Sequence, residues 1–239
     1  MPVMNEIMPI AERFVSINGE GLRAGQLSAF IRFAGCDLAC SYCDTAWAQD
    51  AHAATEHLTI DAIVDWAFSQ PTVCITLTGG EPLQQPMLLD LVKALLDHEA
   101  DRPRTIEIET NGAHDVASLV ALRERGTASR RPWNHLSITI DRKLPSSGMA
   151  DAMLPEHFVA IGADDAVKFV CGDHDDLVAA KSIIDGEGLT LRTNVLLSPV
   201  FGAMDPADIV DFMKKNGMER ERMQLQLHKI VWPNVEKGV

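Results

Sequence analysis

The sequence contains no stretch of about 18 consecutive apolar residues, so no membrane-spanning helix is expected. Its N-terminus has no basic region followed by an apolar core, which is the pattern of a secretory leader. No run of lysine or arginine offsets the net charge of −13, and this argues against a surface that follows nucleic-acid phosphates. We therefore expect a cytoplasmic protein that binds neither membranes nor nucleic acids directly.

Cysteine is also scarce, and its distribution is uneven. Of the five cysteines in the chain, Cys36, Cys40 and Cys43 lie close together, whereas Cys74 and Cys171 are distant in sequence. This pattern does not form a disulfide framework, and thiols stay reduced in the cytosol. Clustered thiolates are soft ligands that select iron–sulfur clusters, zinc or Cu(I).

The number of clustered thiolates narrows the choice of metal. A cubane iron–sulfur cluster bound by three thiolates has one iron atom without a protein ligand, and S-adenosylmethionine can chelate that iron. Two alternatives remain on the cysteines alone. One is structural zinc with a distant histidine as the fourth ligand. The other is a redox pair of Cys40 and Cys43, which leaves Cys36 unused. The nearest histidines, His52 and His57, are expected at the surface.

Apolar periodicity predicts strands that alternate with helices along the chain. The expected strands span residues 10–16, 27–34, 73–78, 105–110, 136–140, 166–171, 189–197 and 223–228, and the expected helices span 59–70, 86–100, 115–125, 175–184 and 205–216. Strand–helix units of about 30 residues are typical of parallel β/α folds. About six units are too few for a closed eight-stranded barrel. We expect an α/β fold, an open partial (β/α)6 barrel, formed by a single domain over residues 1–239.

Polar residues and glycines gather near the expected carboxyl ends of these strands, where parallel β/α folds place their chemistry. Arg32 is a lone cation in an apolar strand and must find an anion or reach solvent; its planar fork suits a carboxylate ligand. The glycines at 79–80 end the next strand, where a missing Cβ lets a ligand approach the backbone. Glu109 points away from the apolar face of its strand, so it faces either solvent or a polar barrel interior.

Two motifs together resemble the radical S-adenosylmethionine superfamily: the C-x3-C-x2-C loop with Tyr42 before its third cysteine, and the later G-G-E-P turn. Further motifs narrow the resemblance to the 7-carboxy-7-deazaguanine synthase family and follow one another over most of the chain. They are Asn18-Gly19-Glu20-Gly21, Arg32-Phe33-Ala34-Gly35-Cys36, Cys43-Asp44-Thr45, Thr78-Gly79-Gly80-Glu81-Pro82, Glu109-Thr110-Asn111-Gly112 and Leu225-Gln226-Leu227-His228-Lys229.

The resemblance implies a lyase that converts 6-carboxy-5,6,7,8-tetrahydropterin to 7-carboxy-7-deazaguanine and releases ammonia, in the biosynthesis of queuosine-type bases. It implies a 4Fe–4S cluster, S-adenosylmethionine and Mg²⁺ as cofactors, with a 5′-deoxyadenosyl radical that removes the C6 hydrogen of the pterin. It also implies a homodimer that receives electrons from a donor such as flavodoxin or ferredoxin. No side chain is expected to be catalytic beyond the cofactor radical.

The resemblance also assigns ligands to residues of this chain. Cys36, Cys40 and Cys43 would bind the cluster, and Thr45 would bind Mg²⁺. The pterin would contact Ile17, Asn18, Gly19, Glu20, Arg32, Thr78, His228 and the terminal carboxylate of Val239. S-adenosylmethionine would contact Gly80, Glu109, Lys143, Ser198, Pro199 and Val200.

The chain departs from the family pattern in two places. Asn18 stands where glutamine is common, and Asp141-Arg142-Lys143 stands where many members have Ser-Pro-Lys. The C-terminal segment is expected to be ordered, since Trp232 is costly to leave exposed and Pro233 stiffens the chain.

Two other functions are compatible with the sequence. An enzyme that installs a glycyl radical on a partner protein would share the cysteine loop and the barrel, and it would have a partner groove in place of a pterin site. A non-enzymatic protein with a structural zinc ion, or with a cluster that has no open iron, would share only the cysteines.

Overall fold

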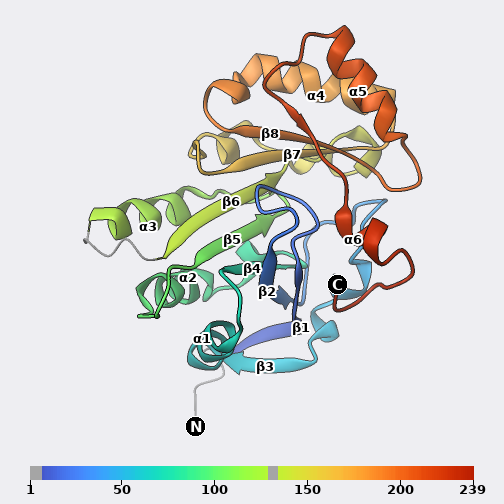
Figure 1. Cartoon of the computed structure of the whole chain (residues 1–239). Coiled ribbons are helices and arrows are strands. Elements are labelled where there is room, and N and C mark those ends of the chain that lie inside the picture. Colours follow the sequence, from blue (N-terminus) through green and yellow to red (C-terminus); the bar gives the residue numbers. More distant parts are fainter. Residues whose placement is uncertain (1–6, 129–133) are drawn as a thin grey trace.

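Residues 7–128 and 134–239 are described in the structure, which is a computed structural model, and their strands form one nine-stranded sheet (Figure 1). The order across the sheet is β3-β1-β2-β4-β5-β6-β7-β8-β9. The strands are β1 (Ile7–Ile17), β2 (Leu27–Phe33), β3 (Glu56–Thr59), β4 (Cys74–Gly79), β5 (Thr105–Thr110), β6 (His135–Asp141), β7 (Ala166–Cys171), β8 (Asn194–Pro199) and β9 (Arg222–Met223). All pairs from β2 to β9 are parallel, whereas β1 is antiparallel to both β2 and β3.

Helices connect most of the successive parallel strands. They are α1 (Ile60–Ser69), α2 (Leu88–Asp97), α3 (Ala117–Ala128), α4 (His174–Glu187) and α5 (Pro206–Lys215), and a short helix α6 (Leu227–Val231) follows β9. Thr59 and Asp205 cap α1 and α5 through their side chains, as expected of residue types that favour this position. None of the helices in the described ranges has the length and apolar character needed to cross a membrane.

The sheet curves into a barrel that stays open, so the predicted open partial barrel is confirmed. Its edge strands are β3 and β9, and no ladder joins them within the described ranges. Between β6 and β7 the connection contains three short 3-10 helices, at Pro145–Ser147, Ala150–Ala152 and Pro155–Phe158, instead of an α-helix.

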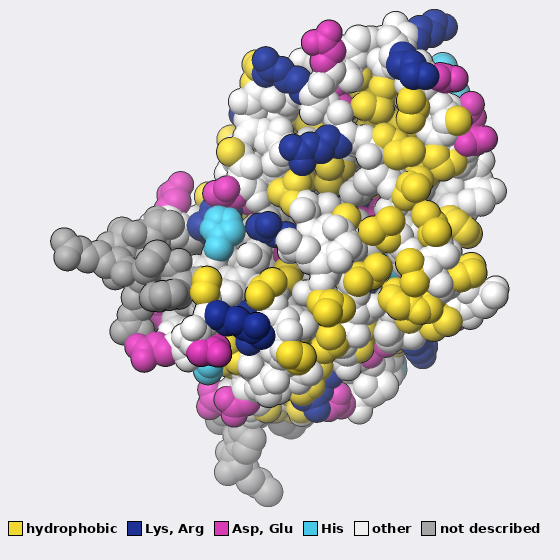
Figure 2. Space-filling model, viewed as in Figure 1, with side chains coloured by type: hydrophobic (Ala, Val, Ile, Leu, Met, Phe, Trp, Pro, Cys, Tyr) yellow, Lys and Arg dark blue, Asp and Glu magenta, His cyan; other side chains and the backbone are white. Residues whose placement is uncertain are grey.

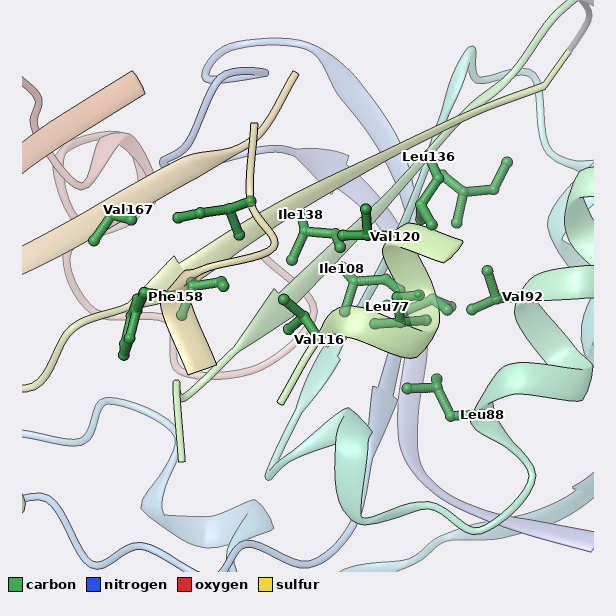
Figure 3. Packing of buried hydrophobic residues seen from close by; sticks show 14 of the residues in the cluster. Leu77, Leu88, Val92, Ile108, Val116, Val120, Leu136, Ile138, Phe158 and Val167 are labelled. Carbon is green, nitrogen blue, oxygen red and sulfur yellow. The ribbon is translucent and has the colours of Figure 1, made fainter. Parts of the chain in front are cut away.

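The two faces of the central strands differ in polarity, and this difference places the hydrophobic core. Leu77, Ile108 and Ile138 are fully buried among residues of α2 and α3 on the outer face of the sheet (Figure 3). Each such side chain contributes about 1.5–3 kcal/mol to stability by its burial. The alternate positions of the same strands, such as Thr76 and Thr139, are buried and polar. The core therefore lies between sheet and helices, and the inside of the barrel is left to polar residues.

The end of the chain differs from the prediction. The strand expected over 223–228 is wrong: β9 ends at Met223, and residues 227–231 form α6. Alternation of apolar and polar residues from Leu225 to His228 is typical of a strand, but tertiary contacts decide the local structure here. The Leu227 N–H donates to the carbonyl oxygen of Gly19 at 2.9 Å, so this segment turns away from the sheet edge.

Two further boundaries also differ. The strand expected from residue 189 begins only at Asn194, because Leu189–Leu191 forms a 3-10 helix after the left-handed cap at Gly188. The segment Glu56–Thr59, where no strand was expected, forms β3 and pairs with the start of β1. A short edge strand of this kind depends on a partner far away in sequence, which local patterns do not reveal.

Candidate active site

A pocket lies at the carboxyl ends of the parallel strands, and most of the predicted site residues line it. From the prediction it contains Gly19, Glu20, Arg32, Cys36, Cys40, Cys43, Thr45, Thr78, Gly80, Glu109, Lys143, His228 and Val239. Five predicted residues are outside its lining: Ile17, Asn18, Ser198, Pro199 and Val200. The pocket also contains residues to which the sequence analysis gave no role, among them Asp44, Asn111, Asp141, Lys168 and Lys229.

The cysteine loop starts where β2 ends and is fastened to the opposite part of the barrel. The Ser41 backbone N–H donates to the carbonyl of Ser147 at 3.0 Å, and its hydroxyl donates to the carbonyl of Ser146 at 2.7 Å. The Tyr42 hydroxyl donates to the carbonyl of Val170, on β7, at 3.2 Å. The aromatic residue before the third cysteine therefore anchors the loop across the mouth of the barrel.

The three clustered thiols fit an iron–sulfur cluster by their chemistry and placement. Cys36, Cys40 and Cys43 are half-buried, without disulfide bonds, and line the same pocket. The Asn111 side-chain amide contacts the Cys36 sulfur at 3.7 Å. Within residues 7–128 and 134–239, no three His, Cys, Asp or Glu side chains converge as ligands of one metal ion. A cubane does not require such convergence, because each thiolate binds a different iron.

The two histidines nearest to the cysteine loop in sequence lie outside the pocket. His52 and His57 are exposed, as predicted, and neither lines the pocket.

The glycines of the G-G-E-P turn are required by the packing of the chain itself. A Cβ at Gly79, whose φ is 126°, would lie 2.3 Å from the Phe33 nitrogen, and one at Gly80 would lie 1.8 Å from the Gly35 oxygen. Two hydrogen bonds join the same segments, from Gly80 N to Phe33 O at 2.9 Å and from Glu81 N to Gly35 O at 2.7 Å. The sequence predicts that these glycines let a ligand approach the backbone. In the structure they let the turn hold the start of the cysteine loop.

Glu81 joins the ends of two neighbouring strands. Its carboxylate accepts hydrogen bonds from the Leu83 N–H at 2.8 Å, the Thr110 hydroxyl at 2.7 Å and the Asn111 N–H at 2.7 Å. Burial raises the pKa of Glu81 to about 6, and these hydrogen bonds limit the increase. Glu81 therefore fixes the position of β5 relative to the G-G-E-P turn.

A chain of ion pairs forms one wall of the pocket. The Lys168 ammonium lies 3.0 Å from Glu20 Oε2 and 3.0 Å from Asp141 Oδ1, and the Lys143 ammonium lies 2.6 Å from Asp141 Oδ2. Burial opposes both lysine charges, but the surrounding negative groups together outweigh it. Asp141 with Cys40 raises the pKa of Lys143, and Asp141 with Glu20 and Glu109 raises the pKa of Lys168. The departure from the family pattern at Asp141 thus places a carboxylate between two pocket lysines.

Glu109 occupies the polar interior of the barrel, which was one of its two expected positions. Its Oε2 accepts a hydrogen bond from the Thr78 hydroxyl on β4 at 2.9 Å. Burial raises the pKa of its carboxyl, and the nearby Lys168 charge opposes that increase. Glu109 and Thr78 therefore form one hydrogen-bonded unit in the pocket wall.

Arg32 forms an ion pair with a carboxylate on the neighbouring strand. Its Nε lies 2.8 Å from Glu12 Oε1, and Glu12 is its register partner on β1. One terminal nitrogen contacts the Thr45 hydroxyl at 3.5 Å. The guanidinium also lies 5.8 Å from the ring centroid of Phe14 and 5.9 Å from that of Trp47. Arginine has five N–H donors. These contacts use fewer than five, so the Arg32 guanidinium can still donate hydrogen bonds to a ligand.

The two ends of the chain meet at the pocket. His228 Nε2 lies 3.4 Å from Asp44 Oδ2, and a Cβ at Gly19 would lie 2.0 Å from His228 Nδ1. Burial opposes the Asp44 charge, but hydrogen bonds from His228 and Thr45, together with the nearby positive charge of Lys229, hold its pKa well below the usual range. The absence of a side chain at Gly19 therefore lets the α6 histidine pack directly on the β1–β2 loop.

The C-terminal tail returns to the pocket along β1. The Gly238 N–H donates to Glu12 Oε2 at 3.1 Å, the Lys237 ammonium lies 4.1 Å from the Trp47 ring centroid, and Val239 lines the pocket. Trp232 is half-buried. The tail thus packs against the barrel, as the sequence analysis expects.

Some residues that were predicted to bind the ligands do not line the pocket and lie behind its wall. The Asn18 side chain is 1% exposed and points below the pocket, donating to Cys74 Sγ at 3.7 Å and accepting from the Thr76 hydroxyl at 3.0 Å. Ser198 donates to Glu20 Oε1 at 2.8 Å. Ile17, half-buried, ends β1; Pro199 is buried and ends β8, with Val200 next to it.

Comparison with known proteins agrees with this geometry. The family model of the Radical SAM superfamily matches residues 30–141. The 7-carboxy-7-deazaguanine synthase of Clostridium acetobutylicum is 40% identical over 230 residues, covering 96% of this chain and 98% of that protein. The synthase of the same name from Chlorobaculum tepidum is 34% identical over 233 residues, covering 96% of each chain. A crystal structure of QueE from Escherichia coli shares the fold, with a TM-score of 0.65 and 18% identity over 94% of this chain and 99% of that one. The chain belongs to the 7-carboxy-7-deazaguanine synthase family of radical S-adenosylmethionine enzymes.

Proposed function

We propose that this protein converts 6-carboxy-5,6,7,8-tetrahydropterin to 7-carboxy-7-deazaguanine with release of ammonia, in the biosynthesis of 7-deazapurines. The observation that carries the proposal is the shared pocket, which is lined by three thiols together with an arginine and a wall of paired charges. The thiols suit an iron–sulfur cluster. The arginine and the paired charges suit a charged small molecule that forms hydrogen bonds.

Cys36, Cys40 and Cys43 would hold a 4Fe–4S cluster, and the wall beside them would hold S-adenosylmethionine. When bound, these cofactors supply the radical that begins the reaction. We assign Glu109 to the ribose hydroxyls, because its carboxyl lies in the pocket and is already oriented by Thr78. Lys143 and the Gly80 backbone also face this space. Ser198, Pro199 and Val200 lie outside the lining, and Ser198 donates a hydrogen bond to Glu20 in the pocket wall.

The pterin would occupy the part of the pocket between Arg32 and His228. A guanidinium binds a carboxylate through parallel N–H donors, so we assign Arg32 to the pterin carboxylate. Glu20 and Thr78 offer polar groups from the facing wall, and Gly19 with His228 closes the far side. We assign direct contacts to Gly19 and Glu20 rather than to Ile17 and Asn18, which position the loop that carries them.

We also propose that Mg²⁺ binds between Thr45 and the substrate. Thr45 presents a hydroxyl to the pocket, beside the Asp44 carboxylate to which it donates at 2.8 Å. Oxygen donors of this kind suit Mg²⁺, which usually keeps several waters and binds through few protein ligands. The Thr45 hydroxyl also contacts Arg32, so the ion would lie close to the carboxylate that Arg32 binds.

Substitution of the cysteines tests the proposed function. We expect Cys36→Ala, Cys40→Ala and Cys43→Ala each to abolish cluster binding and the formation of 5′-deoxyadenosine after anaerobic reconstitution. Cys171→Ala is the matched control, because Cys171 is buried on β7 and does not line the pocket. Iron content, the visible absorption spectrum and product formation from the pterin are measured together. A Cys40→Ala protein with normal iron content and full activity would contradict the assignment.

The Mg²⁺ site has its own test. Thr45→Ala removes the only hydroxyl of that side chain while leaving the cysteines in place, so we expect a weaker response of turnover to added Mg²⁺ with normal cluster content. Thr45→Ser, which keeps the hydroxyl, is the control and is expected to retain the response. An Mg²⁺ titration of Thr45→Ala that matches the wild type would remove Thr45 from the metal site.

We further propose that the chain acts in the cytoplasm as a single domain that forms homodimers and receives electrons from a flavodoxin or ferredoxin. Support for a dimer comes from the surface. Hydrophobic side chains gather over the part of the visible face where Figure 1 places α6 (Figure 2). Ile230 and Val231 on α6 are 54% and 52% exposed, and Phe201 after β8 is 56% exposed. Exposed apolar patches of this kind often mark interfaces.

A further inference from the structure

Glu107 is a buried carboxyl to which the proposed function gives no role. It lies on β5 two positions before Glu109, and its side chain is 0% exposed. Oε1 accepts a hydrogen bond from the Thr139 hydroxyl on β6 at 3.0 Å. Oε2 has no hydrogen-bond partner among the residues that the structure describes. Burying an ionised carboxylate with an unpaired oxygen is costly, so this environment favours the neutral acid.

The carboxyl lies against the loop between β1 and β2. A Cβ at Gly21, whose φ is 77°, would lie 3.0 Å from Glu107 Oε1, so the loop backbone packs on this oxygen. On another side, the Gly21 N–H donates to Gln224 Oε1 at 2.9 Å. Arg23 Nε and Gln224 Nε2 are buried and also have no hydrogen-bond partner in the described ranges. Polar atoms from the loop, from β5 and from the segment after β9 are thus buried around Gly21.

The same loop carries two residues of the pocket wall. Gly19 packs against His228, and Glu20 is paired with Lys168 and hydrogen-bonded to Ser198. A displacement of the loop at Gly21 would therefore move both Gly19 and Glu20. Glu107 is placed to control that position although it does not line the pocket.

We propose that Glu107 is a positioning residue that, as a neutral carboxylic acid, keeps the loop of residues 18–26 packed on the barrel interior and so holds Gly19 and Glu20 in place. The effect on the pterin rests on the function proposed above, whereas the effect on the loop does not. The packing itself is a property of this chain without any ligand.

Several charged groups face Glu107 from the surrounding elements. They are Glu109 on its own strand, Arg23 on the loop and Lys168 on β7, and the Cys74 thiol on β4 is also within electrostatic range. Burial raises the pKa of Glu107 to about 8, and Glu109 adds to the increase; Thr139, Arg23 and Lys168 oppose it. Glu107 is therefore mostly protonated at neutral pH.

The packed loop becomes less favoured as pH rises, because Glu107 loses its proton more readily when the loop is open. With the loop packed the pKa is about 8, and with the loop open and the carboxyl in water it returns to the ordinary value of 4.5. Between pH 4.5 and about pH 8, Glu107 is protonated when the loop is packed and ionised when the loop is open. The packed state is thus most favoured below the lower value, and its advantage falls by up to about tenfold per pH unit across the window. Above about pH 8 no further change is expected, because both states are ionised.

Amide hydrogen exchange of the full-length protein tests this without cofactors or activity. Protection factors, corrected for the intrinsic pH dependence of exchange, are measured for peptides covering residues 18–26 from pH 5 to pH 9. We expect loop protection in the wild type to fall up to about tenfold per pH unit until about pH 8 and then to level off. Glu107→Gln is nearly isosteric and cannot ionise, so its loop protection should not depend on pH. Peptides from α4 serve as the internal control and should behave alike in both proteins.

Loop protection that is independent of pH in the wild type would overturn the proposal, and so would an equal slope in Glu107→Gln. If Glu107→Gln does not fold, the pH dependence of loop protection in the wild type is by itself the test of the proposal. In reconstituted enzyme, KM for the pterin should rise with pH in the wild type and less in Glu107→Gln. If no pterin turnover is found while loop exchange follows the expected profile, the proposed function fails and the role of Glu107 in the loop is supported.

Discussion

Single charged residues inside apolar strands were the most informative signal at the residue scale. Arg32 could be singled out from the sequence because an apolar strand offers it no partner, and Lys168 is likewise the single charge in its strand. Their partners could not be predicted. Arg32 pairs with Glu12 through strand register, and Lys168 pairs with Glu20, which lies 148 positions earlier in the chain. Such pairings depend on which strands and loops the fold brings together, and no local sequence pattern contains that information.

Arg32→Lys separates charge from geometry in the proposed carboxylate site. Lysine keeps the positive charge but loses the planar fork and the stacking beside Phe14 and Trp47. We expect KM for the pterin to rise about tenfold, equivalent to about 1.4 kcal/mol, while cleavage of S-adenosylmethionine without substrate continues. Steady-state kinetics and the amount of 5′-deoxyadenosine formed without pterin are measured.

The chain offers a matched control on the neighbouring strand. Arg13 forms a bidentate pair with Glu56, at 2.9 and 2.6 Å, and lies over the Trp66 ring, but it does not line the pocket. Arg13→Lys should therefore cost similar stability and leave KM unchanged. Unaltered kinetics in Arg32→Lys, or an equal rise of KM in both variants, would remove Arg32 from the substrate site.

At the scale of elements, the alternation of strands and helices could be predicted because the outer face of each central strand and one face of each helix share the same core. The site elements were predictable only in part. The G-G-E-P turn was located, but its glycines serve the contact with Phe33 and Gly35. The helix that carries His228 was predicted as a strand, because its sequence alternates and its structure depends on a hydrogen bond to Gly19.

The C-terminal tail is an element whose removal should affect substrate binding more than stability. Its last residues contact Glu12, the partner of Arg32, and Val239 lines the pocket. A terminal carboxylate there could accept charge-assisted hydrogen bonds from the pterin ring. We expect deletion of Gly238 and Val239 to lower kcat/KM at least about tenfold, equivalent to about 1.4 kcal/mol, with little change in the melting temperature.

A tag at each end provides the comparison. A C-terminal affinity tag should impair turnover as the deletion does, because it replaces the free carboxylate with an amide and adds bulk at the pocket. An N-terminal tag should leave turnover near that of the untagged protein. Equal activity of the two tagged forms, or full activity after the deletion, would show that the tail has no part in binding.

At the scale of the whole molecule, the pocket is built from both ends of the chain and from the barrel between them. The β1–β2 loop, the cysteine loop and α6 meet over the carboxyl ends of the strands, and hydrogen bonds and ion pairs link them there. Of these three parts, α6 depends most on contacts with other residues, because a helix of five residues is not stable alone in water. Packing of its exposed side against a second subunit would stabilise it.

This leads to a prediction about assembly. Ile230 is 54% exposed on α6, and hydrophobic side chains gather in Figure 2 over the place that Figure 1 gives to this helix. We expect the wild type to sediment as a dimer with twice the chain mass of 26.2 kDa, and Ile230→Asp to sediment as a monomer, because a buried unpaired carboxylate opposes association. Leu191→Asp is the control, since Leu191 is 77% exposed in the 3-10 helix before β8. Because His228 and Lys229 lie on the same short helix and line the pocket, the monomeric variant should also bind the pterin more weakly. A wild type that sediments as a monomer at tens of micromolar, or an Ile230→Asp protein that remains dimeric, would mean that α6 is stabilised within one chain and that its exposed side chains have another role.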